Sequence, residues 1–174
     1  MSGRINTYSP IDVVVIIQQK ATGVVHQISG FADDSQINIE RGQDTWKKYV
    51  GVDNDTTRTY SADESGMATL SLAQTSSSND VLYNLYNYDK NTRNGQGLFS
   101  VTIKDASGRS IMFAQNAWIG VVPNQQFGAD VNTRDWVIHC ASMVDIIGGN
   151  GLFTAGDASN IEKLGGTVAS EWIQ

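Results

Sequence analysis

The 174-residue chain is acidic and lightly charged: its formal net charge is −6, its isoelectric point is near 4.7, and 17% of its residues are charged. A soluble domain is typically about one quarter charged, and this length suits one domain with a hydrophobic core. Lys47–Lys48 is the only adjacent basic pair, so the clustered cations that bind nucleic-acid phosphates are missing. This composition argues against a DNA-binding protein, because an acidic surface repels DNA.

Catalytic and metal-binding motifs are not evident, and we expect no enzyme activity, no metal and no cofactor. The single Cys140 rules out an intrachain disulfide and is typical of a small buried hydrophobe. His26 and His139 have no second metal-type ligand nearby, and the sequence has no H-E-x-x-H, C-x-x-C or G-x-S-x-G motif. The acidic run 53–55 lacks the glutamate that completes a calcium loop, which favours a self-capped turn. Paired carboxylates of a glycoside hydrolase stay open, since their separation cannot be read from a sequence.

The N-terminal third predicts an arm and three strands. Residues 1–10 are polar and lack the apolar core of a signal peptide, so we expect an arm and a protein that is not secreted. Ile11–Gln19 is apolar on both faces, as in a buried strand, and is too short to span a membrane. Val24–Phe31 returns as a second strand, and Gln36–Arg41 alternates with its two isoleucines directed inward.

Residues 43–57 show no sustained periodicity and predict a long loop, with a short helical or extended piece around Trp46–Val50. Loops of this length inside a compact domain are usually functional. Exposing Trp46 and Tyr49 to water would be costly, so we expect both to lie on a partner surface. The alternative that they fold back on their own domain stays open.

The stretch from Ser61 to Asp89 predicts a strand followed at once by a helix. Met67–Gln74 alternates between apolar and small or polar residues, which is the pattern of a half-buried strand. Ser77 and Asp80, three residues apart, fit a capping box at a helix start. The helix presents one apolar stripe, formed by Val81, Leu82, Leu85 and Tyr88. This stripe predicts packing against the end or flank of a β-rich body.

The second half predicts three more strands and an extension. Phe99–Lys104 alternates, Ser110–Val122 returns as its hairpin partner, and Arg134–Val144 is the last strong strand. Beyond the glycines at 148–151 we expect a short helix over residues 157–164 that ends at a Gly-Gly pair. The chain then ends in Trp172 and Ile173, and an apolar tip of this kind suggests docking on a neighbouring copy.

The run from Gly66 to Leu82, GMATLSLAQTSSSNDVL, resembles the core signature of the tail tube proteins of contractile-tailed bacteriophages. Other pieces of the family pattern follow in order: Asp12–Ile17, Gly30–Asp33, Ile37–Arg41, Asp63–Gly66, Phe99–Gly108, Ala117–Ile119, Thr133–Cys140 and Ile147–Asn150. Their order and spacing carry the resemblance, which covers the chain from about Asp12 to Asn150.

The periodicities predict a mainly β fold, with either two packed antiparallel sheets or an open β-barrel, and one flanking α-helix. The resemblance implies a single tail tube domain over residues 1–174, with the arm at 1–10, an inter-subunit loop at 43–57 and a C-terminal extension at 151–174. It further implies hexameric rings stacked into a tube, with sheath, tape measure, baseplate and tail terminator proteins as partners. The protein is then expected in the virion after synthesis in the bacterial host cytoplasm, without membrane insertion.

A tube through which DNA passes must not bind it, so acidic side chains on polar strand faces are candidates for the lumen. Asp33, Asp34, Glu40 and Asp63 meet this requirement best, with Glu64 close behind. The alternative for each is a carboxylate that caps a turn or faces outward. The rival function for the whole chain is a monomeric carbohydrate-binding β-sandwich, in which exposed tryptophans and the long loop would form a sugar platform.

Overall fold

The computed structural model describes residues 5–33 and 37–174, and nearly all of its strands belong to one curled antiparallel sheet. The eight strands of this sheet are β1 (Val13–Gln18), β2 (Val25–Gln27), β3 (Ile37–Arg41), β6 (Gly66–Ala73), β7 (Phe99–Asp105), β8 (Ile111–Val121), β9 (Thr133–Cys140) and β10 (Val144–Ile146). Their order is β2-β1-β7-β8-β9-β6-β3, and β10 pairs with β8 next to the end of β9. A second sheet contains only β4 (Trp46–Val50) and β5 (Thr56–Tyr60).

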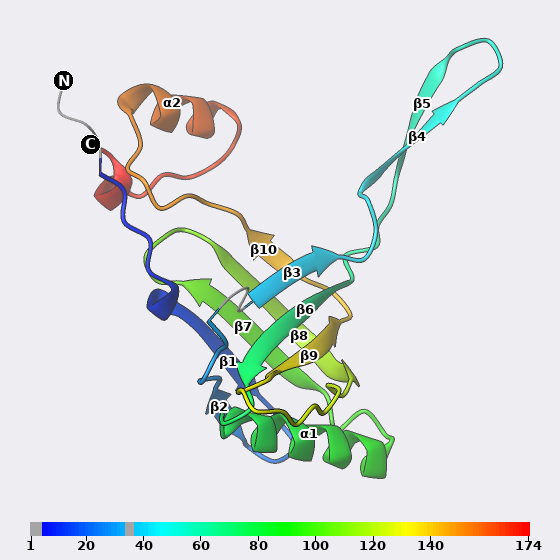
Figure 1. The fold of residues 1–174 in the computed structure, drawn as a ribbon. Helices are drawn as coiled ribbons and strands as arrows, with labels where there is room; N and C mark the ends of the chain where they lie inside the picture. Colours follow the sequence, from blue (N-terminus) through cyan, green and yellow to red (C-terminus); the bar gives the residue numbers. More distant parts are fainter. Residues whose placement is uncertain (1–4, 34–36) are drawn as a thin grey trace.

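The helices lie at opposite ends of this body (Figure 1). Helix α1 (Ser78–Thr92) crosses one end of the sheet, whereas α2 (Ala155–Lys163) belongs to the C-terminal extension at the other end. Two short 3-10 helices, η1 (Pro10–Asp12) and η2 (Ser170–Trp172), precede β1 and close the chain. The expected mainly β fold is confirmed: the large sheet is an open barrel with a flanking helix, and the β4–β5 pair projects away from it (Figure 1).

The hydrophobic core fills the concave side of the sheet and is closed at one end by α1. The alternation of β6 is confirmed, because Ala68, Leu70 and Leu72 are fully buried. Strands β7 and β9 show the same period of two, and the helix contributes its buried Leu82 and Leu85 to the same cluster. Burying one such side chain stabilises the fold by about 1.5–3 kcal/mol, so this alternation largely determines which face turns inward.

Two strands are less buried than the sequence predicts. Strand β1 begins at Val13 rather than Ile11, and its Ile16 is 38% exposed because no second layer covers the outer face. In β3, Ile37 is partly buried but Ile39 is 39% exposed. Strand β3 is an edge strand that pairs only with β6, so its inward face borders an open groove rather than closed core.

The helix starts also differ from the sequence prediction. Ser77 already has helical backbone angles (φ −67°, ψ −19°), and its side chain makes no capping hydrogen bond. The Ser76 hydroxyl accepts from the Ser78 amide instead, at 3.2 Å. The capping box occurs at α2, where the Thr154 hydroxyl and the Asp157 carboxylate each accept from the other residue's backbone amide. A helix therefore starts where the sequence predicts one, near Ser77, but the capping box is found at the start of α2 instead.

Candidate assembly surfaces

The segment predicted as a loop at residues 43–57 is a β-hairpin that runs from Trp46 to Tyr60 and projects from the body (Figure 1). All ten of its strand residues are exposed, including Trp46 at 47% and Tyr49 at 66%. The hairpin joins the body through a narrow neck, where the Ser61 amide donates to the Thr45 carbonyl at 2.8 Å. Of the two alternatives for Trp46–Val50, helical or extended, the structure has the extended one, and the expectation of a long loop around it is wrong.

The two faces of the hairpin have different chemistry. The register pairs Trp46 with Tyr60, Lys48 with Arg58, and Val50 with Thr56, so these six side chains share one face. The Arg58 guanidinium lies 3.8 Å from the centroid of the Trp46 ring. The Tyr60 ring packs against the same indole, with ring centroids 5.3 Å apart. The β-branched and aromatic composition of Thr56–Tyr60 was the signal for a strand that sequence reasoning missed.

The described candidate lumen carboxylates, Asp33, Glu40 and Asp63, are exposed but do not form one cluster. Glu40, in β3, and Asp63, in the turn before β6, lie toward the same end of the β3–β6 pair, which the hydrogen bond from the Gly42 amide to the Ser65 carbonyl extends at 2.9 Å. Asp33 precedes the start of β3 at the opposite end, and Asp34 lies outside the described residues. Among the described residues there is no group of three metal-type ligands.

Three of the candidate carboxylates, with Glu64 included, have local partners. Asp63 accepts a hydrogen bond from the Ser65 amide at 2.9 Å, and hydrogen bonds from the Ser65 side chain and backbone lower the pKa of Asp63. Glu40 accepts from the amide group of Asn38 at 2.6 Å. Glu64 accepts from the Ser142 hydroxyl at 3.0 Å. Asp63 therefore caps its own turn, and it remains exposed on the surface of the subunit.

The C-terminal residues pack on their own chain. The Arg109 guanidinium lies between two aromatic rings, 4.0 Å from the Phe153 centroid and 4.6 Å from that of Trp172, and it donates to the Gly151 carbonyl at 2.7 Å. The Phe153 amide donates to the Trp172 carbonyl at 2.7 Å. Trp172 is partly buried in this arrangement, whereas Ile173 stays 41% exposed. Ile173 is therefore the apolar group of this tip that remains available to a neighbour.

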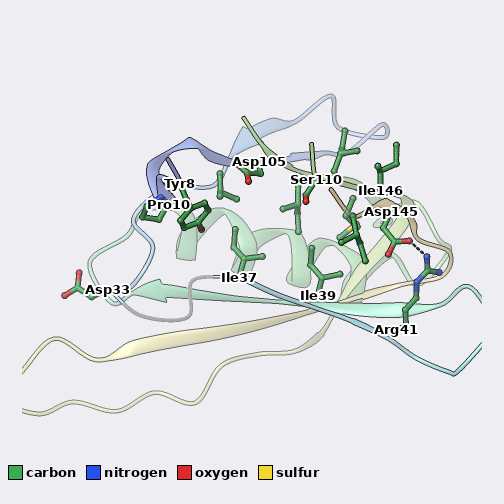
Figure 2. Close-up of a pocket in the computed structure, with 15 residues that line it drawn as sticks. Tyr8, Pro10, Asp33, Ile37, Ile39, Arg41, Asp105, Ser110, Asp145 and Ile146 are labelled. Carbon is green, nitrogen blue, oxygen red and sulfur yellow. Dashed lines mark hydrogen bonds and ion pairs between the residues drawn. The ribbon is translucent and has the colours of Figure 1, made fainter. Parts of the chain in front are cut away.

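An apolar groove of about 600 Å³ opens between β3 and the strands on the far side of the curled sheet (Figure 2). Ile37 and Ile39 form one wall, and side chains of β1, β7, β8 and β10 form the others. An ion pair between Arg41 of β3 and Asp145 of β10 joins the two walls. Sequence reasoning missed this groove because its lining comes from segments far apart in the chain.

The sheet also leaves unpaired strand edges. Among residues 5–33 and 37–174, strand β3 pairs only with β6, β2 only with β1, and β10 only with β8. Exposed edges offer free backbone amides and carbonyls to another strand. Such edges, together with the projecting hairpin, are features of a subunit more than of an isolated domain.

The two histidines and the cysteine, which are the residues that could have indicated catalysis, pack within the fold. His26 Nε2 and the buried Ser78 Oγ are 2.9 Å apart, and the His139 ring stacks on Trp118 with centroids 5.9 Å apart. Burial raises the pKa of the Cys140 thiol to about 11, as expected for a small buried hydrophobe. Within the described residues, none of the helices has the length and apolar character needed to cross a membrane.

The fold is that of proteins from contractile injection systems. A chain in the sheath–tube complex of the extracellular contractile injection system PVC, in its extended state, matches with a TM-score of 0.54 and 12% identity, over 80% of this chain and 91% of that chain. The anti-feeding prophage cap that terminates the AFP tube matches with a TM-score of 0.53 and 9% identity, over 83% and 93%. The PVC sheath/tube terminator matches with a TM-score of 0.53 and 12% identity, over 83% and 100%.

Sequence comparison identifies the family within this class. Structural protein ORF10 of Pseudomonas phage KPP10 is 40% identical over 173 residues, which cover 99% of this chain and 100% of that protein. Residues 5–149 match the family described as the bacteriophage PhiTE tail tube protein. The chain therefore belongs to this family of phage tail tube proteins, which confirms the resemblance seen in the sequence. Its role is structural, as a component of a phage tail.

Proposed function

We propose that six copies of the protein form a ring and that the rings stack into a tail tube through which DNA leaves the capsid. The observation that carries this proposal is the set of unpaired edges at β2, β3 and β10, which another copy can cover. Ring closure is the usual symmetric solution for such surfaces. The number six is taken from the resemblance to the family.

The proposed partners follow from the same assignment. The similar solved structures include a sheath–tube complex and a sheath/tube terminator, which supports a sheath protein and a tail terminator as partners here. A tape measure protein inside the tube and baseplate proteins at its end complete the set. The protein would be made in the cytoplasm of the bacterial host, act without membrane insertion, and catalyse no reaction.

Self-assembly is tested by light scattering and negative-stain microscopy of the purified protein over a range of concentrations. We expect rings with six subunits and, at higher concentration, stacked tubes of constant width. A strictly monomeric protein at high concentration would refute the proposal and favour the carbohydrate-binding alternative. Binding of oligosaccharides to the monomer would then be the next measurement.

The hairpin is proposed to reach a neighbouring subunit or ring, with Trp46 and Tyr49 as anchors. Because Thr45 and Ser61 are hydrogen bonded at the neck, residues 46–60 can be replaced by Asn-Gly, which closes a short turn. This variant should keep the circular dichroism spectrum and core stability of the parent but fail to form tubes. Normal tubes from the shortened protein would show that the hairpin is not an interface.

The C-terminal tip and the arm at residues 1–10 are proposed to contact neighbours as well, with Trp172 and Ile173 as the apolar residues. Ile173 is the better placed of the two, because Trp172 already packs beside Arg109. Hydrogen exchange should then be slower in the tube than in the monomer over both termini. Equal exchange rates in the two states would contradict this proposal.

At least two of Asp33, Asp34, Glu40 and Asp63 are proposed to line the lumen. Changing all four to lysine should leave assembly possible but impair DNA ejection, because cations would hold the phosphates. The altered tubes should retain DNA at low salt and release it at high salt, where screening weakens the attraction. Full infectivity without DNA retention would place these carboxylates elsewhere.

A further inference from the structure

The hairpin face that carries Trp46 also brings together two cations that have no ion-pair partner among the described residues. Lys48 and Arg58 are directly opposite each other on adjacent strands, and both side chains lie on this face. Like charges in that position destabilise a strand pair. Among the described residues the one ion pair is Arg41–Asp145, so neither Lys48 nor Arg58 is neutralised there.

The Lys48–Arg58 pair lies in a two-stranded hairpin, which has little stability of its own. The hairpin has two strands, all of its strand residues are exposed, and no third strand pairs with it in the part of the chain that the structure describes. Such an isolated pair is only marginally stable in water. The placement of Lys48 opposite Arg58 is therefore costly in the free subunit and becomes favourable when an anion covers both.

Arg58 is held in a position suited to receive that anion. Its guanidinium lies over the Trp46 ring, whose other neighbour is Tyr60. Stacking uses the face of the guanidinium and leaves its in-plane N–H donors for a carboxylate. The aromatic pair also restricts the Arg58 side chain, which lowers the entropy cost of binding.

The chemistry of the partner follows from charge. Three of the 12 basic residues of the chain, Lys47, Lys48 and Arg58, lie on the hairpin strands, although the whole chain carries −6. The remainder of each copy is thus strongly acidic and offers carboxylates to a hairpin. A nucleic acid fits less well, because two exposed cations on an acidic protein give little affinity for phosphates.

We propose that the hairpin face formed by Trp46, Lys48, Arg58 and Tyr60 binds carboxylates on the acidic surface of a second copy of this chain. This inference rests on the proposed stacking of subunits and assigns its chemistry to one face of the hairpin. The opposite face, which carries Lys47 and Tyr49, is then the less charged contact. Salt should weaken the interaction between copies.

Zero-length carbodiimide cross-linking of assembled tubes tests the proposal directly, because it joins a lysine amine to a carboxylate in contact with it. Tubes made from equal parts of ¹⁴N- and ¹⁵N-labelled protein identify cross-links between copies by mass spectrometry. We expect Lys48 to be joined to an aspartate or glutamate of another copy, and Lys47 on the other face to serve as the internal control. Cross-links between copies that involve Lys47 but not Lys48 would overturn the proposal.

A charge-removing variant provides the second test. Lys48→Gln with Arg58→Gln should leave the unfolding of the core unchanged, because the hairpin belongs to a separate two-stranded sheet, and should raise the protein concentration needed for tube formation about tenfold or more. Its assembly should also be less sensitive to salt than that of the parent. The matched control Lys90→Gln with Lys104→Gln removes the same charge at two exposed lysines outside the hairpin and should assemble normally.

The outcomes separate this inference from the proposed function. If the parent protein never assembles, the tube proposal fails; if the parent assembles and the Lys48 and Arg58 variant assembles equally well with the same salt dependence, only this inference fails. Fluorescence anisotropy with a short DNA duplex tests whether the hairpin binds nucleic acid instead of carboxylates. Binding by the parent that the variant loses would overturn the carboxylate assignment and point to nucleic acid.

Discussion

Gly66 is a position where one added carbon should both destabilise the fold and displace the hairpin. Its backbone lies where β3, β6 and β9 meet, paired with Arg41 on one side and Cys140 on the other. A β-carbon at this position would approach the Glu40 carbonyl oxygen and the end of the Met143 side chain, both inside the 3.0 Å that real β-carbons essentially never cross. Met143 is itself buried, with 1% exposure, so it has little space to move.

The magnitude follows from what must yield. The carbonyl of Glu40 is backbone, and ordinary contact begins at 3.4 Å, so the end of β3 must withdraw by roughly 1 Å. Overpacking of this kind costs typically 1–3 kcal/mol, and a weakened ladder hydrogen bond adds about 1 kcal/mol. We therefore expect Gly66→Ala to lower the free energy of unfolding by about 3 kcal/mol, and Tm by roughly 6–12 °C for a chain of this size.

The assay is thermal and urea unfolding, followed by circular dichroism at a concentration where light scattering detects no polymer. Gly156→Ala is the control, because the nearest atom to its added carbon is 3.8 Å away and it lies within α2. The control should leave Tm unchanged or raise it, with a gain in the free energy of unfolding of no more than about 1 kcal/mol. A Tm for Gly66→Ala within about 2 °C of the parent would refute the reasoning.

Three further predictions concern other parts of the fold. Arg109→Ala should expose residues 151–174 to hydrogen exchange and cost about 1–3 kcal/mol, because two aromatic rings and a carbonyl lose their cation; unchanged exchange would contradict this. Hydrogen bonds from Ser107, and then from Asn150, lower the pKa of Asp105 from 3.8, so its contribution to stability is present above that value and is lost as pH falls through the lower folded pKa; Asp105→Asn should remove this acid dependence of unfolding. Cys140, with a pKa of about 11, should resist alkylation at pH 8 in the folded protein and react once urea unfolds it, whereas rapid labelling of the native protein would show an accessible thiol.

The parts of the fold that could be predicted from sequence are those whose burial follows a local period. Strand β6 and helix α1 are of this kind, because the alternation around Leu70 and the stripe through Leu82 and Leu85 each turn one face inward. The hairpin was missed as regular structure because it buries neither face: with every strand residue exposed, its pattern contains no inward side. Register and cross-strand pairs, not hydrophobic period, define such an element.

The geometry of the candidate assembly surfaces could be predicted from sequence only in outline. Trp46 stood out in the sequence because a tryptophan is costly to expose, but its contacts with Arg58 and Tyr60 depend on the register of two strands. The groove and the ion pair between Arg41 and Asp145 join residues more than one hundred positions apart, and no local pattern indicates such a pair. The cap at Ser77 failed because several serines compete at one helix start, and the backbone of the fold selects among them.

The narrow neck between Thr45 and Ser61 makes the length of the hairpin independent of the body that carries it. Adding two residues to each strand would advance the tip by roughly 6–7 Å and keep the same side chains on each face, since a strand repeats every two residues. The body would gain no new contact and lose none. If the hairpin contacts the next ring, as proposed, the spacing between stacked subunits becomes a property that evolution, or an engineer of tubular assemblies, can change in steps without refolding the core.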